Sequence, residues 1–246
     1  MASAFAQYYD LLLFGVDYKK TADFIETAIK EHAPSAKNIA DVSCGTGTLA
    51  LELYTRGYNV TASDISADML CVAFDKAQRQ NARIMFLNQN MRDLCLDVQT
   101  DVVVSTLDST NCLVNNGEIA TYFSSVFKNL VPGGLFIFDV NTQYQFEHIY
   151  ADNSFVLEDE GVFLAWQNSY NPKSRKCYFD LCFFCKLQSG NYERIDESIC
   201  ERMYSDRFLG LSLKKCGFEL LGIYSDLDFS APGREDRRHY FIARKK

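Results

Sequence analysis

Hydrophobic positions in the first 150 residues follow two periods that alternate along the chain. Short β-branched or alternating runs predict strands, and apolar positions three or four residues apart predict helices between them. The clearest strand is Asp101 to Thr106, DVVVST, because such near-continuous β-branched sequence is typical of a strand covered on both faces. Other strands are expected near Ile39–Val42, Tyr58–Asp64, Arg83–Leu87 and Leu135–Val140, and helices near Lys20–His32, Leu49–Arg56, Ser66–Gln80 and Glu118–Leu130. This alternation favours a parallel sheet that binds ligands at the carboxyl ends of its strands.

The pattern changes after residue 153. From Ser154 to Tyr204 apolar and polar positions alternate around the turns at 171–174 and 189–191, which predicts several antiparallel strands. A short helix, about Asp206 to Cys216, leads to strands at Phe218–Tyr224 and His239–Ala243. The connection between these last strands is too short for a crossover helix, so the final strand should be antiparallel.

A small-residue turn, Ser43-Cys-Gly45-Thr-Gly47, separates the first strand from the helix after it. Glycines let a backbone approach a ligand closely, and a helix N-terminus favours a negative group. Asp41 is expected at the end of the strand, where its side chain would face the space that holds the ligand. Gly45-x-Gly47-x-x-Ala50, with Asp64 at the end of the next strand, fits a dinucleotide-binding fingerprint, so a nicotinamide oxidoreductase is one interpretation.

Composition narrows the classes of partner. The 246 residues are 48% hydrophobic and carry a net charge of −7, which suits a packed core and disfavours binding to a nucleic-acid backbone. No stretch is apolar enough to span a membrane, and the first nine residues lack the basic region of a signal peptide. We therefore expect a cytoplasmic protein, a monomer or weak homodimer, with neither nucleic acid nor membrane as a partner.

Nine cysteines raise the question of a metal site or disulfides. The one C-x-x-C, Cys182-Phe-Phe-Cys185, lies in a strand-like segment, where residues three apart point to opposite faces and chelate one ion poorly. We expect buried, reduced thiols and no metal.

The order of motifs resembles the class I S-adenosylmethionine (SAM) dependent methyltransferases of the small bacterial methyltransferase-domain type. Asp41-Val-Ser43-Cys-Gly45-Thr-Gly47 is similar to the family's D-x-G-x-G-x-G, with serine at the first glycine position. Further matches are Tyr9-Asp-Leu-Leu, Leu107-Asp-Ser-Thr-Asn111, Val131-Pro-Gly-Gly and Phe138-Asp-Val-Asn141.

The resemblance implies an α/β fold: a Rossmann-like seven-stranded sheet with helices on both faces, an antiparallel last strand and an inserted small antiparallel sheet. It implies a SAM-binding domain of residues 1–153 and 205–246, and an inserted substrate-cover subdomain of residues 154–204. It also implies SAM as the cofactor and a methyl acceptor as the substrate.

Roles for cofactor binding follow from the same resemblance. Asp41, Ser43, Gly45 and Gly47 would line the methionine part, and Asp64 would accept from the ribose hydroxyls. The adenine would meet Ile65, Met69, Asn90, where the family usually has Asp, and the backbone of Met91. Leu107 and Asp108 would border the sulfonium, and Tyr9 and Tyr18 resemble an aromatic lid.

The acceptor is harder to define. The chain lacks the Pro-Pro and Pro-Cys motifs of the DNA methyltransferases, which favours a small molecule with a nitrogen or oxygen acceptor. Candidate catalytic residues are His148, Tyr9 and Asp139, and candidate substrate contacts are Asn111, Trp166, Tyr170 and Arg202. A SAM-binding module without catalysis is the other alternative to the nicotinamide enzyme.

Overall fold

The computed structural model describes residues 4–12, 15–159 and 161–246. Its main feature is a seven-stranded sheet in the order β10-β11-β5-β4-β1-β2-β3. The strands β1 to β5 are parallel, and β11 runs antiparallel to both β5 and β10. The strands are β1 (Asn38–Val42), β2 (Asn59–Asp64), β3 (Met85–Asn88), β4 (Thr100–Ser105), β5 (Leu130–Asn141), β10 (Phe218–Tyr224) and β11 (Arg238–Lys245).

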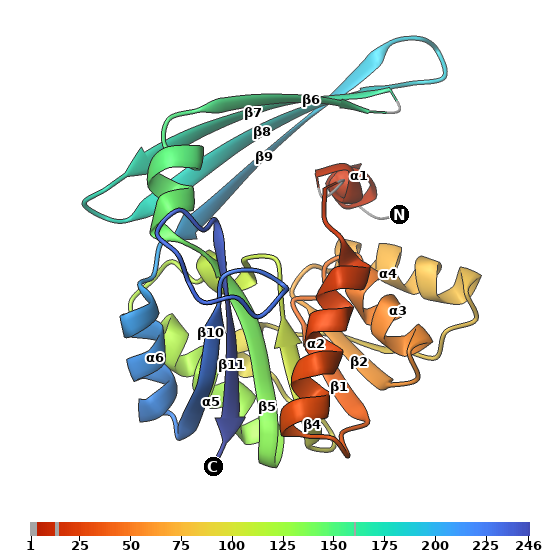
Figure 1. The fold of residues 1–246 in the computed structure, drawn as a ribbon. Helices are drawn as coiled ribbons and strands as arrows, with labels where there is room; N and C mark the ends of the chain where they lie inside the picture. Colours follow the sequence, from red (N-terminus) through yellow and green to blue (C-terminus); the bar gives the residue numbers. More distant parts are fainter. Residues whose placement is uncertain (1–3, 13–14, 160) are drawn as a thin grey trace.

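Helices cover both faces of this sheet (Figure 1). One face carries α2 (Tyr18–His32), α3 (Thr48–Thr55) and α4 (Ala67–Arg79), and the other carries α5 (Glu118–Asn129) and α6 (Asp206–Lys215). The β4 strand shows why both faces must be covered. Val102 and Val104 pack with α2 and α3, whereas Val103 packs with α5 and α6.

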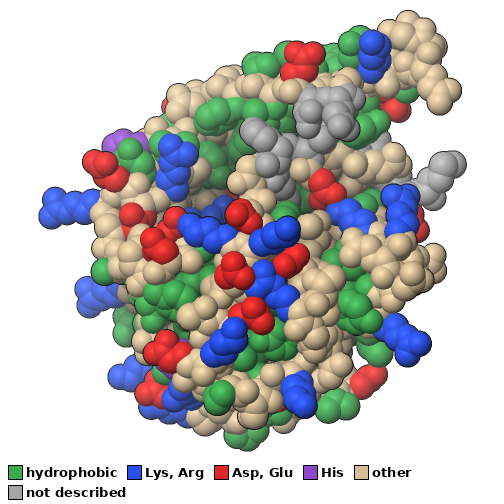
Figure 2. Space-filling view, turned by 45° about the vertical axis from the view of Figure 1, so that its right-hand side comes forward, with side chains coloured by type: hydrophobic (Ala, Val, Ile, Leu, Met, Phe, Trp, Pro, Cys, Tyr) green, Lys and Arg blue, Asp and Glu red, His purple; other side chains and the backbone are tan. Residues whose placement is uncertain are grey.

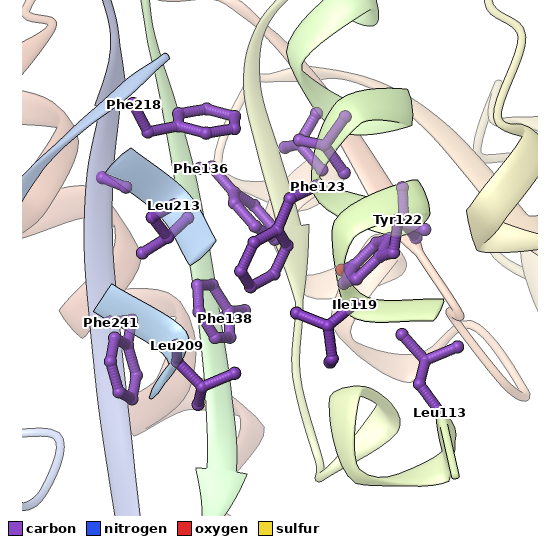
Figure 3. Close-up of a cluster of buried hydrophobic side chains, with 14 of the residues drawn as sticks. Leu113, Ile119, Tyr122, Phe123, Phe136, Phe138, Leu209, Leu213, Phe218 and Phe241 are labelled. Atoms are coloured by element: carbon purple, nitrogen blue, oxygen red, sulfur yellow. The ribbon is translucent and has the colours of Figure 1, made fainter. Parts of the chain in front are cut away.

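Aromatic side chains fill the layer between β5, α5 and α6 (Figure 3). Phe123 of α5 lies against Phe136 and Phe138 of β5, with ring centroids 5.6 and 5.4 Å apart. All three rings are fully buried, and Leu209 and Leu213 of α6 close the layer. Burial of these side chains fixes β5, whose carboxyl end lies next to the site described below.

A second, four-stranded antiparallel sheet lies above the main one (Figure 1). Its strands are β6 (Ser154–Asp159), β7 (Val162–Asn171), β8 (Lys176–Lys186) and β9 (Tyr192–Arg202), paired in sequence order. A π-helix, η3 (Gln145–Tyr150), connects β5 to it. The predicted fold class is confirmed, including both sheets and the antiparallel last strand.

Several predicted details were wrong. The strand expected near Leu135–Val140 begins earlier, because Val131 to Gly134 also belong to the long strand β5, where pairing with β4 shifts register. The N-terminal aromatic segment contains a helix that periodicity did not predict, α1 (Ala4–Leu12). All nine cysteines are free, but Cys71, Cys95 and Cys112 are exposed rather than buried.

Candidate cofactor and acceptor site

One pocket opens at the carboxyl ends of β1 and β4. Residues from α1, α2, the glycine turn and the segment after β4 line it together. The lining residues are Tyr9, Tyr18, Asp41, Ser43, Cys44, Gly45, Thr46, Leu49, Thr106, Leu107 and Ser109. Six predicted cofactor residues are therefore brought into one pocket from positions almost 100 residues apart.

The glycine turn has the backbone that its sequence requires. Ser43, Gly45 and Gly47 have φ values of 62°, 53° and 75°, the left-handed region that glycine favours. A Cβ at Gly47 would lie 2.8 Å from the Cβ of Ala73, so glycine also permits α4 to pack against the turn. Ser43 adopts the same conformation as a glycine, which explains how serine stands at the family's first glycine position.

Asp64 ties the second strand to this turn. Its Oδ2 accepts a hydrogen bond from the backbone N–H of Gly45 at 2.9 Å, and its Oδ1 accepts from Ser66 N–H at 2.9 Å. Burial raises the pKa of this carboxyl, while the backbone donors of Ser66 and Gly45 oppose the rise. The carboxylate thus lies beside the pocket with lone pairs left to accept from a further ligand.

Asp41 is the unusual group in the pocket. Its side chain is buried, with a relative exposure of 2%, and its Oδ2 has no hydrogen-bond partner. Burial and the neighbouring Asp64 raise its pKa to about 7, although the N–H of Ala50 opposes the rise. Buried carboxylate oxygens are normally satisfied, so an unpartnered one that lines a pocket fits a cationic ligand group.

The α1 helix covers the pocket and reaches the second, four-stranded sheet. The ring of Tyr9 lies 3.4 Å from the position that a Cβ of Gly45 would take. The neighbouring Asp10 accepts from Thr46 Oγ1 and Lys76 Nζ, both at 2.5 Å. The Phe5 ring meets Phe183 of β8 edge-on at 5.8 Å. This helix therefore connects the glycine turn, α4 and the second sheet.

The residues expected around the adenine differ in their exposure and in the hydrogen bonds that they already make. Ile65 is 68% exposed beside the pocket, whereas Met69 is buried. The Asn90 Oδ1 already accepts from Arg92 N and Arg92 Nε, at 3.0 and 3.2 Å. The acceptor oxygen of Asn90 is therefore already in use, and Met91 packs against the core.

A buried polar network lies just past β4 and β5. Leu107 and Asp108 both have left-handed backbone, with φ values of 58° and 57°. The N–H of Asp108 donates to Asp139 at 3.2 Å, and Arg238 of β11 pairs closely with Asp139. Because Asp139 is fully buried and occupied by these partners, it does not suit the expected role of a base that meets an acceptor. The hydrogen bond from Asp108 N–H instead suits Asp139 to the role of orienting Asp108.

The other two catalytic candidates also have unfavourable surroundings for a base. His148 is exposed on η3, packs against Tyr144 with the two rings tilted and their centroids 4.9 Å apart, and does not line the pocket. Tyr9 does line the pocket, but burial, reinforced by Asp108 and Tyr18, raises the pKa of its hydroxyl. Its neutral hydroxyl is a donor and a packing surface.

The four predicted substrate contacts have structural partners. The amide of Asn111 is fully buried, donates to Arg202 O and accepts from Asn141 N, both at 2.9 Å. The guanidinium of Arg202 binds Val114 O and Asn116 Oδ1. These contacts fasten β9 to the main sheet and leave Asn111 no access to a substrate.

The two aromatic candidates lie in the second sheet. Trp166 donates from Nε1 to Asn168 at 2.5 Å and packs near Tyr150 and Phe179. Tyr170 packs near Phe146, and its buried hydroxyl has no hydrogen-bond partner.

Sequence reasoning missed several residues of the site. Glu201, Asn141 and Tyr150 belong to the polar network, and Lys76 holds α1. The sequence pattern could have identified Glu201, because it lies six residues after Ile195 and two after Ile199, and even spacings place all three on the same, apolar face of the strand. Glu197 and Glu201 are both acids in that register, and of the two only Glu201 is buried.

The described residues contain neither a metal-binding cluster nor a membrane-spanning helix. Within 4–12, 15–159 and 161–246, no three His, Cys, Asp or Glu side chains are grouped to hold a metal ion. In the same ranges no helix combines the length and apolar character needed to cross a bilayer.

The fold and pocket define a class. The sheet is mostly parallel, with a glycine turn after β1, an acid at the end of β2 and an antiparallel last strand. These features define a Rossmann-like protein that binds a nucleoside cofactor. Residues 39–134 match the family model described as a methyltransferase domain.

Relatives define the family. A protein named as a methyltransferase in Geobacillus sp. (strain WCH70) is 34% identical over 98% of both chains. A crystal structure of an S-adenosylmethionine-dependent methyltransferase from Clostridium acetobutylicum ATCC 824 superposes with a TM-score of 0.89, at 28% identity, over 97% of this chain and 96% of that one. The chain belongs to the SAM-dependent methyltransferases, so SAM is its cofactor and the nicotinamide alternative is set aside.

One further relative has a more specific name. The dTDP-3-amino-3,4,6-trideoxy-alpha-D-glucopyranose N,N-dimethyltransferase of Streptomyces venezuelae is 32% identical over 60% of each chain.

Proposed function

We propose that this enzyme transfers the methyl group of SAM to a small-molecule acceptor, at a nitrogen or an oxygen atom. The observation that carries the assignment of the pocket is the unpartnered, buried Oδ2 of Asp41 among the pocket's lining residues. It fits the α-ammonium group of SAM, which supplies a positive charge and N–H donors.

The other pocket residues fit the remaining parts of the cofactor. We assign the methionine part to Ser43, Gly45 and Gly47, and the ribose hydroxyls to Asp64. Ile65 and Met69 would flank the adenine, with Met91 N–H and, after displacement of one Arg92 donor, Asn90 at its edge. We assign Leu107 and Asp108 to the region next to the sulfur, with Tyr9 and Tyr18 as the cover.

When bound, SAM supplies an activated methyl group, so the protein's task is to align an acceptor and exclude water. The second sheet, residues 154–204, is proposed as the acceptor's cover. A hollow lined by hydrophobic side chains lies beneath it (Figure 2). Residues of α1, η3 and the sheet form a continuous apolar cluster there, including Phe5, Phe146, Tyr150 and Phe183.

A small molecule with an amine group suits these surroundings best. The Streptomyces venezuelae relative is named for N,N-dimethylation of an amino sugar nucleotide. Neither His148 nor Asp139 is placed as a free base, and an amine needs a weaker base than a hydroxyl does. A cytoplasmic location, a monomer or weak homodimer, and the lack of a nucleic-acid partner stay predictions from the sequence.

The test is a turnover screen. The protein is incubated with SAM and mixed amine, hydroxyl and thiol acceptors, and S-adenosylhomocysteine is measured. We expect product above the acceptor-free rate with at least one amine mixture, and its loss in Asp64→Ala. Tight binding of SAM without turnover by any acceptor would instead support the non-catalytic SAM-binding module.

A further inference from the structure

One part of the main sheet is covered by helices on a single face. The connections β1–β2, β2–β3 and β4–β5 contain the helices α3, α4 and α5, whereas the connection from β3 to β4 contains only the short 3-10 helix η1 (Met91–Asp93). Within the described ranges, the face of β2 and β3 opposite α3 and α4 therefore has no helix of its own. Parallel strands are normally covered on both faces, so this open face is an exception.

Alternation along the two strands shows which side chains reach the open face. Val60 of β2 and Phe86 of β3 pack in the layer that contains α2 and α3. Neighbouring positions of a strand point to opposite faces, so Thr61, Met85 and Leu87 point to the open face. The Met85 side chain is 56% exposed there.

A groove of about 480 Å³ lies on this face, next to the outermost strand β3. Thr61, Met85 and Leu87 line it, together with the segment before β4 that contains Val98. Val98 is 79% exposed, although its side chain is fully apolar. A hollow beside exposed apolar side chains is typical of a surface that binds another macromolecule.

Two charges of opposite sign also line the groove. Arg83 and Asp97 are both exposed, and neither side chain makes an ion pair or a hydrogen bond with any residue that the structure describes. The neighbouring acid at the start of β4 differs, because Asp101 accepts hydrogen bonds from the backbone of Lys37 and from Asn38. Arg83 and Asp97 are therefore available to pair with charges of a partner.

We propose that this groove is a homodimer interface, in which a second copy of the chain docks about a two-fold axis. In such an interface the same patch lies on both copies, so each contact occurs twice. Arg83 of each copy pairs with Asp97 of the other. Val98 of each copy packs into the groove of the other, beside Met85.

The charges favour a second copy over a different partner. The patch carries one cation and one anion, so a partner surface of a single sign would attract one of them and repel the other. A copy turned by the two-fold axis matches both. Because each chain has a net charge of −7, two copies repel one another at long range, and their association depends on these local pairs.

The size of the patch predicts a reversible dimer. The strand β3 (Met85–Asn88) has four residues, and such short edge strands offer little backbone for pairing with another strand. Side-chain packing in the groove and the two ion pairs therefore carry the contact. Small interfaces of this kind belong to weak and transient complexes.

The groove lies at the opposite end of the strands from the cofactor pocket. The first residues of four strands line it, namely Asn38 of β1, Asn59 of β2, Met85 of β3 and Thr100 of β4. The cofactor pocket opens at the carboxyl ends of β1 and β4. Docking of a second copy therefore leaves both cofactor pockets open, and dimer formation can be tested without methyl transfer.

Sedimentation velocity over a range of protein concentrations tests the interface. We expect the wild type to be a monomer at about 1 µM and to shift toward a dimer by about 300 µM. Arg83→Asp and Asp97→Arg each bring like charges together, so each should weaken association by at least about tenfold. The double variant restores opposite charges in exchanged positions and should associate within about threefold of the wild type.

Two further variants complete the design. Val98→Ser removes apolar contact without a change of charge and should also weaken association, so it tests the groove if a charge variant does not fold. Arg207→Asp, at an exposed position of α6, changes the net charge as much as Arg83→Asp does and should associate like the wild type. Thermal unfolding and binding of S-adenosylhomocysteine show that each variant is folded.

The result expected is a concentration-dependent dimer that the single charge variants weaken and the double variant restores. A monomer at every concentration would overturn the proposal. Single variants that associate like the wild type would overturn it too, as would a double variant as weak as the single ones, because recovery requires Arg83 and Asp97 to meet across the two copies.

Discussion

Asp10 of α1 accepts a hydrogen bond from the Lys76 ammonium of α4 at 2.5 Å, directly beside the glycine turn. The same lysine donates to Thr48 Oγ1 at 3.0 Å, and Thr46 donates to Asp10. Because Tyr9 lies over Gly45, these contacts fasten α1 across the opening of the pocket. The ion pair is therefore placed to control how readily the cofactor leaves.

Replacement of Lys76 should speed cofactor release. We expect Lys76→Met to raise the SAM dissociation rate by about 2–5-fold, the effect of a partly exposed ion pair worth roughly 0.5–1 kcal/mol. Stopped-flow fluorescence with and without excess competing S-adenosylhomocysteine measures that rate. Arg79→Met, at an exposed position of the same helix, is the control. Equal rates in Lys76→Met and wild type would show that α1 does not limit release.

SAM affinity should depend on pH through Asp41. Its pKa of about 7 means that the carboxylate which would hold the ammonium group is only partly formed at pH 6. We expect affinity to rise by about tenfold, roughly 1.4 kcal/mol, between pH 6 and 7.5 as Asp41 ionises. In Asp41→Asn the affinity should be lower and this rise should be absent. A variant that kept the full rise would assign it to another group.

The same carboxyl should limit stability without cofactor. The folded-state pKa of Asp41 lies above its usual value of 3.8, so its contribution to stability is complete below that value and is lost as pH rises through about 7. Asp41→Asn should therefore raise the free energy of unfolding more at pH 8 than at pH 5, by about 2 kcal/mol. Denaturant unfolding at both pH values measures the difference, and a pH-independent effect would contradict the buried charge.

The serine at the first glycine position should be replaceable. Ser43 has a φ of 62°, which costs a residue with a Cβ about 1–2 kcal/mol, whereas glycine loses roughly 0.5–1 kcal/mol of chain entropy. Ser43→Gly should therefore leave stability unchanged or raise it by about 1 kcal/mol, and SAM should still bind. The matched change Ser63→Gly, in the interior of β2, should destabilise the protein. Thermal unfolding that ranks the two variants in the opposite order would contradict the turn geometry.

Much of the fold could be predicted because local sequence and packing agree. Val102, Val103 and Val104 alternate between two buried layers, as their β-branched sequence indicates. Ser66 caps α4 by accepting from Met69 N–H, which its position before an apolar helical pattern predicts. The helix α1 was missed because its apolar side chains pack against the second sheet and the glycine turn, contacts that short-range periodicity does not describe.

The cofactor side of the site was easier to predict than the acceptor side. Asp41, Gly45 and Asp64 follow consecutive strand ends of one parallel sheet, so local motifs bring them together. Glu201 reaches the Asn141 amide that also binds Asp108 only because β9 folds back onto the ends of β4 and β5, which brings together segments 93 residues apart in numbering. Arg202 and Asn111 suggested substrate contacts by their polarity, but tertiary packing uses them to hold that same connection.

Titration calorimetry of SAM into wild type, Asp64→Ala and the exposed control Asp75→Ala tests the central claim most directly. Loss of the Asp64 carboxylate removes its hydrogen bond from Gly45 N–H and the charge-assisted hydrogen bonds that we propose to the ribose, so Asp64→Ala should bind at least about 30-fold more weakly, roughly 2 kcal/mol. Asp75→Ala should match the wild type, and thermal unfolding should show both variants folded. Binding of SAM by folded Asp64→Ala with wild-type affinity, or no binding by the wild type, would contradict the assignment of this pocket.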